Sequence, residues 1–154
     1  MFQHLPPLDK MRKVRREVLK TINDLRARYD DRAPLHVDEF ANNAAEEYAH
    51  MLLTEDPDEP KMHKICETHH VMEPNKTKAV FGYAYFEDDY ESPDKSRFYE
   101  NMDAHGLLLE LTEERELLAH KDYTHLGIGF ASDNIRVLIV EILSTKTFTI
   151  DRLQ

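Results

Sequence analysis

The stretch from Tyr123 to Leu143 constrains the fold more than any other part of the sequence. Two apolar runs rich in isoleucine, valine and phenylalanine flank a short polar break, Ser132-Asp133-Asn134. β-Branched residues suit a pleated surface, and Asp and Asn tolerate turn dihedrals, so the pattern predicts a β-hairpin. In the second run, one predicted face carries Ile135, Val137, Ile139 and Leu143, and the other carries Leu138, Val140 and Ile142. A strand that is apolar on both faces must be covered on both sides.

Two segments before the hairpin have the apolar spacing of amphipathic helices, with steps of three and four residues. The first helix is predicted from Asp9, as its N-cap, to about Asp30, with these residues inward: Met11, Val14, Val18, Ile22, Leu25 and Tyr29. The second helix is predicted from Val37 to about Leu53, and its buried face is rich in alanine: Phe40, Ala41, Ala44, Ala45, Tyr48, Ala49 and Leu52. Small side chains on that face allow a neighbouring element to come close.

The middle of the chain is less regular. Residues 54–78 are a long connection with one short helix, and Ala79–Glu87 is aromatic and strand-like, which predicts a third strand. An acidic loop follows at 88–94. A third helix is predicted from Lys95 to about Leu111, with inward positions at Phe98, Met102, His105, Leu108 and Leu109, and Thr112 is predicted to cap a short fourth helix.

These elements predict the α+β class. We expect an α-β-α sandwich in which a central three-stranded antiparallel sheet is flanked by helices. At 154 residues the chain fits one domain spanning 1–154, with a core over about 9–145 and short extensions at both ends.

The net charge of −10 disfavours nucleic acid and anionic membranes as partners, because both are polyanions. The charge is uneven: residues 10–28 sum to +6, so the rest of the chain carries −16. A basic helix on an acidic body suits docking on an acidic protein surface, and a solvated helix face is the equally weighted alternative. The partner-contact candidates are Lys10, Arg12, Arg15 and Arg16.

Cysteine usage and the N-terminal sequence bear on the compartment. Cys66 is the single cysteine, so an intrachain disulfide is impossible and a reducing compartment is expected. The first ten residues lack an apolar signal-peptide core, and no apolar run reaches transmembrane length. We therefore expect a non-secreted intracellular protein, cytoplasmic or in a cilium or the cytoskeleton, with no transmembrane segment.

Three segments, in the same order as in a known family, carry a resemblance. Leu35–Ala49 resembles the segment L-x-W-D-x-x-L-A-x-x-A-x-x-W-A, and Ile22–Arg26 is similar to H-N-x-x-R, with isoleucine in place of the histidine. Asp122–Gly129 resembles N-x-Y-T-H-I-G-V-G. These motifs belong to the CAP superfamily of cysteine-rich secretory, antigen 5 and pathogenesis-related proteins. The resemblance implies an α-β-α sandwich with a central antiparallel sheet.

The resemblance also implies a cleft with two histidines and two acidic residues, which holds a divalent metal in some members. The family's first glutamate falls on Tyr83, its helical glutamate falls near Leu111, and its second histidine falls on Glu114. The first histidine has three candidate counterparts: His63, His69 and His70. With three of four positions replaced, the resemblance implies a retained scaffold without inherited metal chemistry, and we expect no cofactor.

Other residue patterns have a functional and a structural interpretation. His63, Cys66, His69 and His70 have zinc-ligand chemistry, but no second ligand pair follows, which favours a histidine cluster without metal. Cys66 with His63, His69 or His105 as base has the components of a nucleophile, yet a lone cysteine is typically a small buried hydrophobe. Four carboxylates offer an acid–base pair, although capping and solvated charge are favoured: Glu110, Glu113, Glu114 and Glu116.

The aromatic run Phe81, Tyr83, Tyr85 and Phe86 has the composition of a lipid-pocket lining, although packing on the sheet is the favoured interpretation. From these patterns we expect a non-catalytic structural or adaptor subunit of a large intracellular assembly, such as a ciliary axoneme or an organellar complex. Its expected partners are other protein subunits. The alternative is a binding protein that holds a lipid or a divalent metal in the remodelled cleft. A hydrolase is the third hypothesis.

Overall fold

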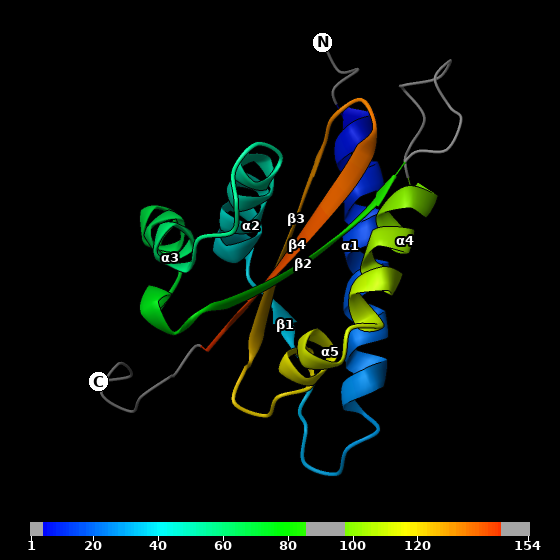
Figure 1. Cartoon of the computed structure of the whole chain (residues 1–154). Helices are drawn as coiled ribbons and strands as arrows, with labels where there is room; N and C mark the ends of the chain where they lie inside the picture. The colour runs from blue at the N-terminus through cyan, green and yellow to red at the C-terminus, as the bar shows by residue number, and fades with distance from the viewer. Residues whose placement is uncertain (1–4, 86–97, 146–154) are drawn as a thin grey trace.

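The structure is a computed structural model that describes residues 5–85 and 98–145. A four-stranded sheet lies between two layers of helices (Figure 1). Its elements in chain order are α1 (Leu5–Arg26), β1 (His36–Val37), α2 (Glu39–Leu52), α3 (Glu59–Thr68), the 3-10 helix η2 (Pro74–Lys76), β2 (Lys78–Tyr85), α4 (Phe98–Leu109), α5 (Thr112–Leu118), β3 (His125–Ser132) and β4 (Arg136–Ser144). The predicted α+β class, with helices on both faces of a sheet, is confirmed.

The sheet itself differs from the prediction. Its strand order is β1-β3-β4-β2, and β1 runs parallel to β3, so the sheet is mixed and four-stranded rather than antiparallel and three-stranded. β1 is two residues long, which is too short to produce a visible alternation in the sequence. It is held by backbone hydrogen bonds from His36 N to Thr124 O (3.0 Å) and from Asp38 N to Leu126 O (3.0 Å).

The second helix consequently begins later than predicted. Val37 belongs to β1, and Asp38 caps α2 by accepting a hydrogen bond from Phe40 N at 3.0 Å. This is the usual role of an aspartate at an N-cap, where it satisfies a backbone donor that has no intrahelical partner. Phe40 lies in the first turn of α2 and is 50% exposed, so its predicted burial is wrong. The alanine face, Tyr48 and Leu52 are buried as predicted.

Each face of β4 enters a different hydrophobic core. Val137, Ile139 and Leu143 join the core formed with α1, α4 and α5, where they meet Val14, Val18, Ile22, Leu108 and Leu118. Leu138, Val140 and Ile142 join the core formed with α2 and α3, where they meet Ala45, Ala49, Met62 and Cys66. The predicted division of these six residues between two faces is confirmed. The prediction is wrong for Ile135, which is 58% exposed in the turn.

The turn between β3 and β4 explains why Ile135 lies outside the strand. The Asp133 carboxylate accepts hydrogen bonds from Ile135 N (2.9 Å) and Arg136 N (3.0 Å), closing an Asx-type turn. These backbone hydrogen bonds, assisted by Arg136, keep the pKa of Asp133 below its ordinary value. The polar break predicted a turn at the correct place, but the strand begins one residue later, at Arg136.

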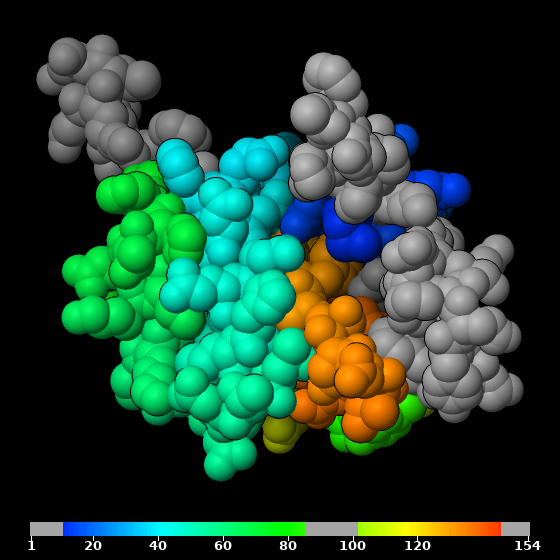
Figure 2. Space-filling view, turned by 90° about the horizontal axis from the view of Figure 1, so that it is seen from above, coloured from blue at the N-terminus to red at the C-terminus, as the bar shows by residue number. Residues whose placement is uncertain are grey.

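Helix α2 packs closely on β3 because two strand positions are glycines. A Cβ at Gly127 would stand 2.2 Å from the carbonyl carbon of Ala41, and a Cβ at Gly129 would stand 2.1 Å from Glu46 N. Helix α3 packs on the outer side of α2 (Figure 2). The expected close approach to the alanine face is therefore made by the backbone of β3.

Replacing Gly129 with alanine is expected to destabilise the fold by about 2–3 kcal/mol, because the added methyl group meets helix backbone that cannot move independently. Urea unfolding of the Gly129→Ala variant measures this loss. Gly106→Ala is the matched control, since a Cβ at Gly106 meets nothing within 4 Å and Gly106 lies inside α4. That control is expected to be stabilising by about 0.5–1 kcal/mol, through helix propensity alone. Equal effects of the two substitutions would contradict this account of α2 packing.

Several predicted boundaries are corrected. Helix α1 begins at Leu5, so Asp9 lies within it and is not its N-cap, and it ends at Arg26, which leaves Tyr29 exposed beyond its end. The N-cap position of α5 is Leu111, and Thr112 is its first residue. The short helix predicted in the long connection is α3, capped by Asp58.

The acidic loop at 88–94 lies outside the described residues, as does Phe86. Within residues 5–85 and 98–145, no helix is both long and apolar enough to cross a membrane.

Candidate functional site

An open groove with a volume of about 920 Å³ runs between β2, α4 and the first turn of α5. It is lined from β2 by residues Phe81–Tyr85, and from the helices by Met102, Asp103, Gly106, Leu107, Leu108, Glu110, Leu111 and Glu114. Tyr83, Leu111 and Glu114 all belong to this lining. The three cleft positions assigned by resemblance therefore lie together around one groove.

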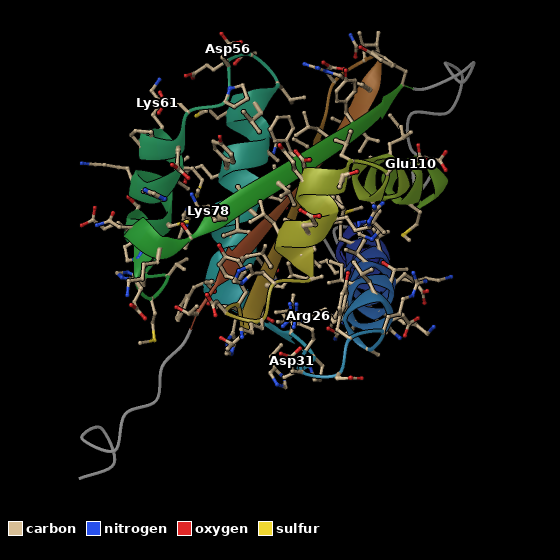
Figure 3. All side chains as sticks on the ribbon, turned by 60° about the horizontal axis from the view of Figure 1, so that its bottom comes forward. Arg26, Asp31, Asp56, Lys61, Lys78 and Glu110 are labelled. Atoms are coloured by element: carbon tan, nitrogen blue, oxygen red, sulfur yellow. The ribbon has the colours of Figure 1, made fainter. Side chains whose placement is uncertain are left out.

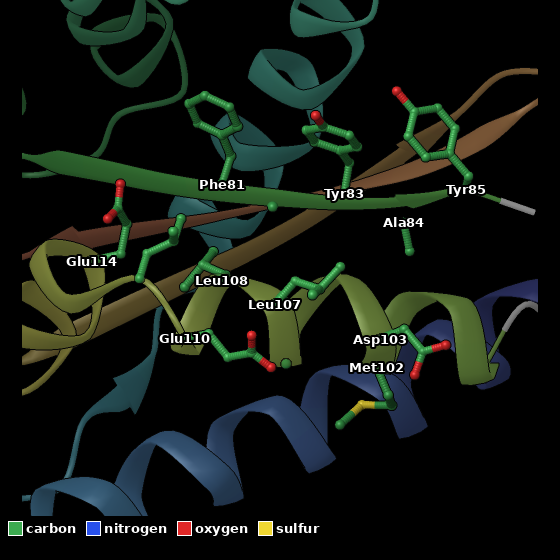
Figure 4. Close-up of a pocket in the computed structure, with 13 residues that line it drawn as sticks. Phe81, Tyr83, Ala84, Tyr85, Met102, Asp103, Leu107, Leu108, Glu110 and Glu114 are labelled. Carbon is green, nitrogen blue, oxygen red and sulfur yellow. The ribbon is translucent and has the colours of Figure 1, made fainter.

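Strand alternation determines which β2 side chains face α4. Figure 4 shows Phe81, Tyr83 and Tyr85 pointing to one side of β2, while Ala84 points to the side of α4. Gly82 lies where α4 crosses the strand, and a Cβ there would stand 2.5 Å from Ala104 O. The glycine thus lets α4 approach β2, and the groove opens beside this crossing.

The groove walls combine apolar surface with carboxylates. Leu107 and Leu111 are 49% and 50% exposed. Asp103, Glu110 and Glu114 add three carboxylates to the same lining. The described lining contains no histidine, cysteine, serine or threonine. The lining is therefore acidic and apolar in character.

The histidine and cysteine candidates lie on α3 and just after it, apart from the groove, and they do not converge. His63 Nε2 lies 3.2 Å from Thr77 O, and His69 Nε2 lies 2.7 Å from Glu47 Oε1. His70 adopts a positive φ of 65° and its ring meets that of Phe40 at 6.3 Å. In the described part of the chain, no group of three or more histidine, cysteine, aspartate or glutamate side chains is arranged to hold a metal ion.

Cys66 is fully buried between α3 and the start of β2. Its Sγ lies 3.6 Å from Met62 Sδ and 3.7 Å from Thr77 Oγ1. Burial raises the pKa of the Cys66 thiol, which opposes the thiolate form that a nucleophile or a zinc ligand requires. Cys66 is therefore a core residue here.

The basic candidates on α1 divide into two kinds. Arg15 is half-buried: its Nε donates to Ile128 O at 2.8 Å and its Nη2 lies 3.2 Å from Glu46 Oε1, so the guanidinium joins α1 to β3 and α2. Arg12 and Arg16 are exposed. The side chain of Lys10 lies outside the described residues. Arg12 and Arg16 thus present the accessible charge among these candidates.

A buried polar network joins α1 and α4 to β4, and it was not predicted from the sequence. His105 Nδ1 lies 2.6 Å from Glu141 Oε2, and His105 Nε2 lies 2.6 Å from Thr21 Oγ1. Both His105 and Glu141 are buried in the core beside α1 and α4. The inward position of His105 was predicted, and the detectable signal for its partner was a glutamate inside the apolar run of β4. Because His105 and Glu141 are both buried, we interpret their hydrogen-bond network as structural.

The segment Asn23–Arg26, which resembles the family pattern, is also structural. Asn23 exchanges two hydrogen bonds with the backbone of Leu35, at 2.8 and 3.2 Å. The side chain of Arg26, at the end of α1, is labelled in Figure 3. Its buried guanidinium donates to four backbone carbonyl oxygens: Ala33 O at 2.7 Å, Leu118 O at 2.8 Å, His120 O at 2.9 Å and Tyr123 O at 3.1 Å. Burial, and to a lesser extent the nearby Arg32, lower the pKa of Arg26.

Comparison with known sequences gives a consistent result. The model of the CFAP184 CAP-like domain matches residues 8–140 of this chain. The chain is 27% identical over 152 residues to cilia- and flagella-associated protein 184 of Tetrahymena thermophila. This alignment covers 93% of the chain, which spans 18% of the length of that relative.

Two solved structures share the fold. An extracellular protein of Bacillus anthracis that contains an SCP domain superposes with a TM-score of 0.57 at 16% identity, covering 85% of this chain and 40% of that protein. An outer surface protein of Borrelia burgdorferi superposes with a TM-score of 0.56 at 18% identity, covering 87% of this chain and 94% of that protein. At these identities the likeness shows the fold alone.

Proposed function

The chain belongs to the CFAP184 CAP-like domain family, a divergent branch of the CAP superfamily, and we propose that it is a non-catalytic structural or adaptor module of a ciliary assembly. In this role it binds other protein subunits of that assembly. The name of the Tetrahymena relative supports the ciliary setting.

The observation that carries the proposal is the groove at the family's cleft positions. Where the family pattern has a histidine and two glutamates, this chain has Glu114, Tyr83 and Leu111, and all three line the groove. A phenol, an aliphatic side chain and a carboxylate do not form a metal-ligand set, because too few donors face one point. The groove therefore retains a concave surface while lacking the donors of the family's metal site, as expected for a module that binds by shape and charge.

Lipid binding in the same groove is the second candidate function, and the groove volume of about 920 Å³ favours lipid binding. The carboxylates of the groove oppose lipid binding. Asp103, Glu110 and Glu114 would repel the carboxylate of a fatty acid, and an open groove leaves an acyl chain in contact with water. A protein partner, which can bring its own basic groups, fits the groove better.

Incorporation of the protein into a ciliary assembly tests the proposal through α1. The paired substitution Arg12→Glu and Arg16→Glu is expected to lower incorporation by about tenfold or more, because two exposed cations become anions at the proposed contact surface. The measurement is co-sedimentation of the full-length tagged protein with isolated axonemes from cells that lack the native protein.

The matched control changes the same charge in the same region: Lys20→Glu with Arg28→Glu, both at exposed positions. This control is expected to leave incorporation near the wild-type level. If all three proteins incorporate equally, the start of α1 is not the contact surface. Recovery of the wild-type protein as a monomer without partners would overturn the proposed function.

A further inference from the structure

The two outer edges of the sheet differ in whether their backbone groups have hydrogen-bond partners, and at the β3 edge they do. Beyond the short β1, the backbone groups of β3 that point away from β4 are satisfied individually. Ile128 N donates to Asn42 Oδ1 at 2.7 Å, and Phe130 N lies 3.2 Å from Glu46 Oε1. Ile128 O accepts from Arg15 Nε at 2.8 Å. Side chains of α1 and α2 therefore close this edge to any further strand.

The backbone groups of β2 can be assigned from the register of β4. Hydrogen bonds from Thr124 N to Ser144 O and from Asp133 N to Arg136 O show that Ser144 and Arg136 direct their carbonyls toward β3. Direction alternates along an antiparallel strand, so Val137, Ile139, Glu141 and Leu143 direct their backbone groups toward β2. Their register partners are Ala84, Gly82, Val80 and Lys78, respectively.

The remaining residues of β2 consequently point outward. Phe81, Tyr83 and Tyr85 direct their N–H and C=O groups away from β4, along the edge that lines the groove. In the part of the chain that the structure describes, no strand pairs with this edge. β2 pairs with β4 in continuous register over eight residues, so no bulge twists its edge out of reach.

The surroundings of this edge select the chemistry of an occupant. On one side stand the exposed rings of Tyr83 and Tyr85, and on the other stand the half-exposed Leu107 and Leu111 of the α4–α5 region. Asp103, Glu110 and Glu114 place three carboxylates along the same groove (Figure 4). Arg136 lies 5.8 Å from the Tyr83 ring centre, and it is engaged by Asp133 and by Leu53 O.

From this geometry we propose that an extended segment of a partner subunit, with alternating apolar and basic side chains, adds to the outer edge of β2 as a fifth strand. Backbone hydrogen bonds to Phe81, Tyr83 and Tyr85 supply the register. Because side chains alternate across a strand, the basic side chains of the segment meet the carboxylates on the α4–α5 side, and its apolar side chains pack on the exposed rings of Tyr83 and Tyr85 on the other side. The paired stretch, residues 81–85, spans about 17 Å at roughly 3.3 Å per residue. The proposal rests on the proposed function and names its partner.

Charge disfavours a second copy of this chain as the occupant. Edge-to-edge pairing of two β2 strands would bring Asp103, Glu110 and Glu114 of both copies toward one interface, since a two-fold contact joins the same patch on each chain. Like charges set opposite each other are destabilising. A basic segment removes this repulsion and neutralises the carboxylates.

Direct binding is tested with the peptide Lys-Val-Lys-Val-Lys-Val-Lys and the 154-residue chain, followed by NMR hydrogen exchange. The peptide is expected to slow amide exchange of Phe81, Tyr83 and Tyr85 by about tenfold or more, since these amides gain hydrogen-bond partners. Gly82 and Ala84 already pair with β4 and are expected to change little. Two controls, Glu-Val-Glu-Val-Glu-Val-Glu and Lys-Val-Lys-Pro-Lys-Val-Lys, are expected to leave exchange unchanged. Protection elsewhere, equal protection by the proline peptide, or dimerisation of the chain would overturn the proposal.

A proline substitution tests the edge within the assembly. Tyr83→Pro removes an outward N–H that makes no bond to β4, so β2 can still pair with β4, whereas Tyr83→Val removes the same ring and keeps the N–H. Axoneme co-sedimentation and photo-cross-linking from position 107 of the full-length protein are expected to fall about tenfold or more for the proline variant relative to valine. Circular dichroism and thermal unfolding of both variants establish that each is folded.

The outcomes separate the two proposals. If the wild-type protein enters the assembly and the folded proline and valine variants do so equally, the edge proposal fails and the proposed function stands. If the wild-type protein enters no assembly, the proposed function fails, and the peptide experiment alone decides whether β2 accepts a strand. A cross-link from position 107 to another copy of this chain contradicts the basic-segment proposal.

Discussion

Replacing Arg26 with leucine is expected to destabilise the protein by about 4–5 kcal/mol, a large fraction of the total stability of a domain of this size. The guanidinium donates to four carbonyl oxygens, of Ala33, Leu118, His120 and Tyr123. Hydrogen bonds to a charged donor are each worth about 1.5–3 kcal/mol and do not add fully. Without the donor, these carbonyls lose their shared partner in the interior, and the connection before β3 loses its attachment to α1.

Two further variants make the Arg26 prediction specific. Arg26→Lys keeps the positive charge but replaces a planar fork of donors with a single ammonium group, so a substantial part of the loss is expected to remain. Arg28→Leu makes the same chemical change two residues further on, at an exposed position, and is expected to stay within about 0.5 kcal/mol of wild type. Urea unfolding compares all four proteins. A midpoint for Arg26→Leu equal to that of Arg28→Leu would show that the four contacts do not hold this region.

The second large effect is expected at the pair formed by His105 and Glu141. Replacing Glu141 with leucine leaves His105 Nδ1 buried without its partner at 2.6 Å, and the expected cost is about 3–5 kcal/mol. His105→Leu leaves the Glu141 carboxylate buried in the same way and is expected to cost a similar amount. Glu141 Oε1 already lacks a hydrogen-bond partner among the described residues, so the contact of Oε2 with His105 Nδ1 is the one that satisfies this buried side chain.

The double variant tests whether His105 and Glu141 are energetically coupled. Changing both residues to leucine removes both buried polar groups, and a well-packed apolar pair is often neutral or stabilising relative to the native pair. We therefore expect the double variant to be more stable than either single variant, with a coupling energy of about 1–3 kcal/mol in a double-mutant cycle. Thr21 Oγ1 retains its bond to Val18 O at 2.8 Å, so it is not left without a partner. Additive losses in the cycle would refute the coupling.

The core was largely predictable because its signal is local. The residues of β4 alternate over seven consecutive positions from Val137 to Leu143, and both faces were assigned correctly. Helix α2 was recognised because small and apolar residues recur at helical spacing. β1 was missed because two residues cannot show a period, and its pairing with β3 joins positions that lie far apart in the chain.

The contacts that stabilise the ends of these elements were not predictable from local patterns. Arg26 belongs to a segment with a family resemblance, but its acceptors lie as far along the chain as Tyr123, a separation of 97 residues. Arg15 was assigned to a docking surface by charge, whereas the fold brings Glu46 and Ile128 O to its guanidinium. A charged residue on an amphipathic helix has no sequence mark that separates these two environments.

The groove shows a similar division. Resemblance assigned Tyr83, Leu111 and Glu114 to one cleft, and the structure lines one groove with all three. That the groove follows the edge of the sheet depends on the strand order, since β2 is an edge strand because β3 pairs with the opposite side of β4. Strand order is a property of long-range pairing, so the outward direction of the backbone groups of Phe81, Tyr83 and Tyr85 could be assigned only from the structure.

The position of β4 has a consequence for how the protein forms during translation. β4 lies at the centre of the sheet, between β3 and β2, although it follows both in the sequence. Until residues 136–144 leave the ribosome, β2 has no partner strand among the described residues, and β3 has only the two residues of β1. The helices emerge earlier but lack the surface on which they pack. The sheet therefore cannot be completed until residues 136–144 are available, and a chain truncated before Arg136 lacks the strand that joins β2 to β3.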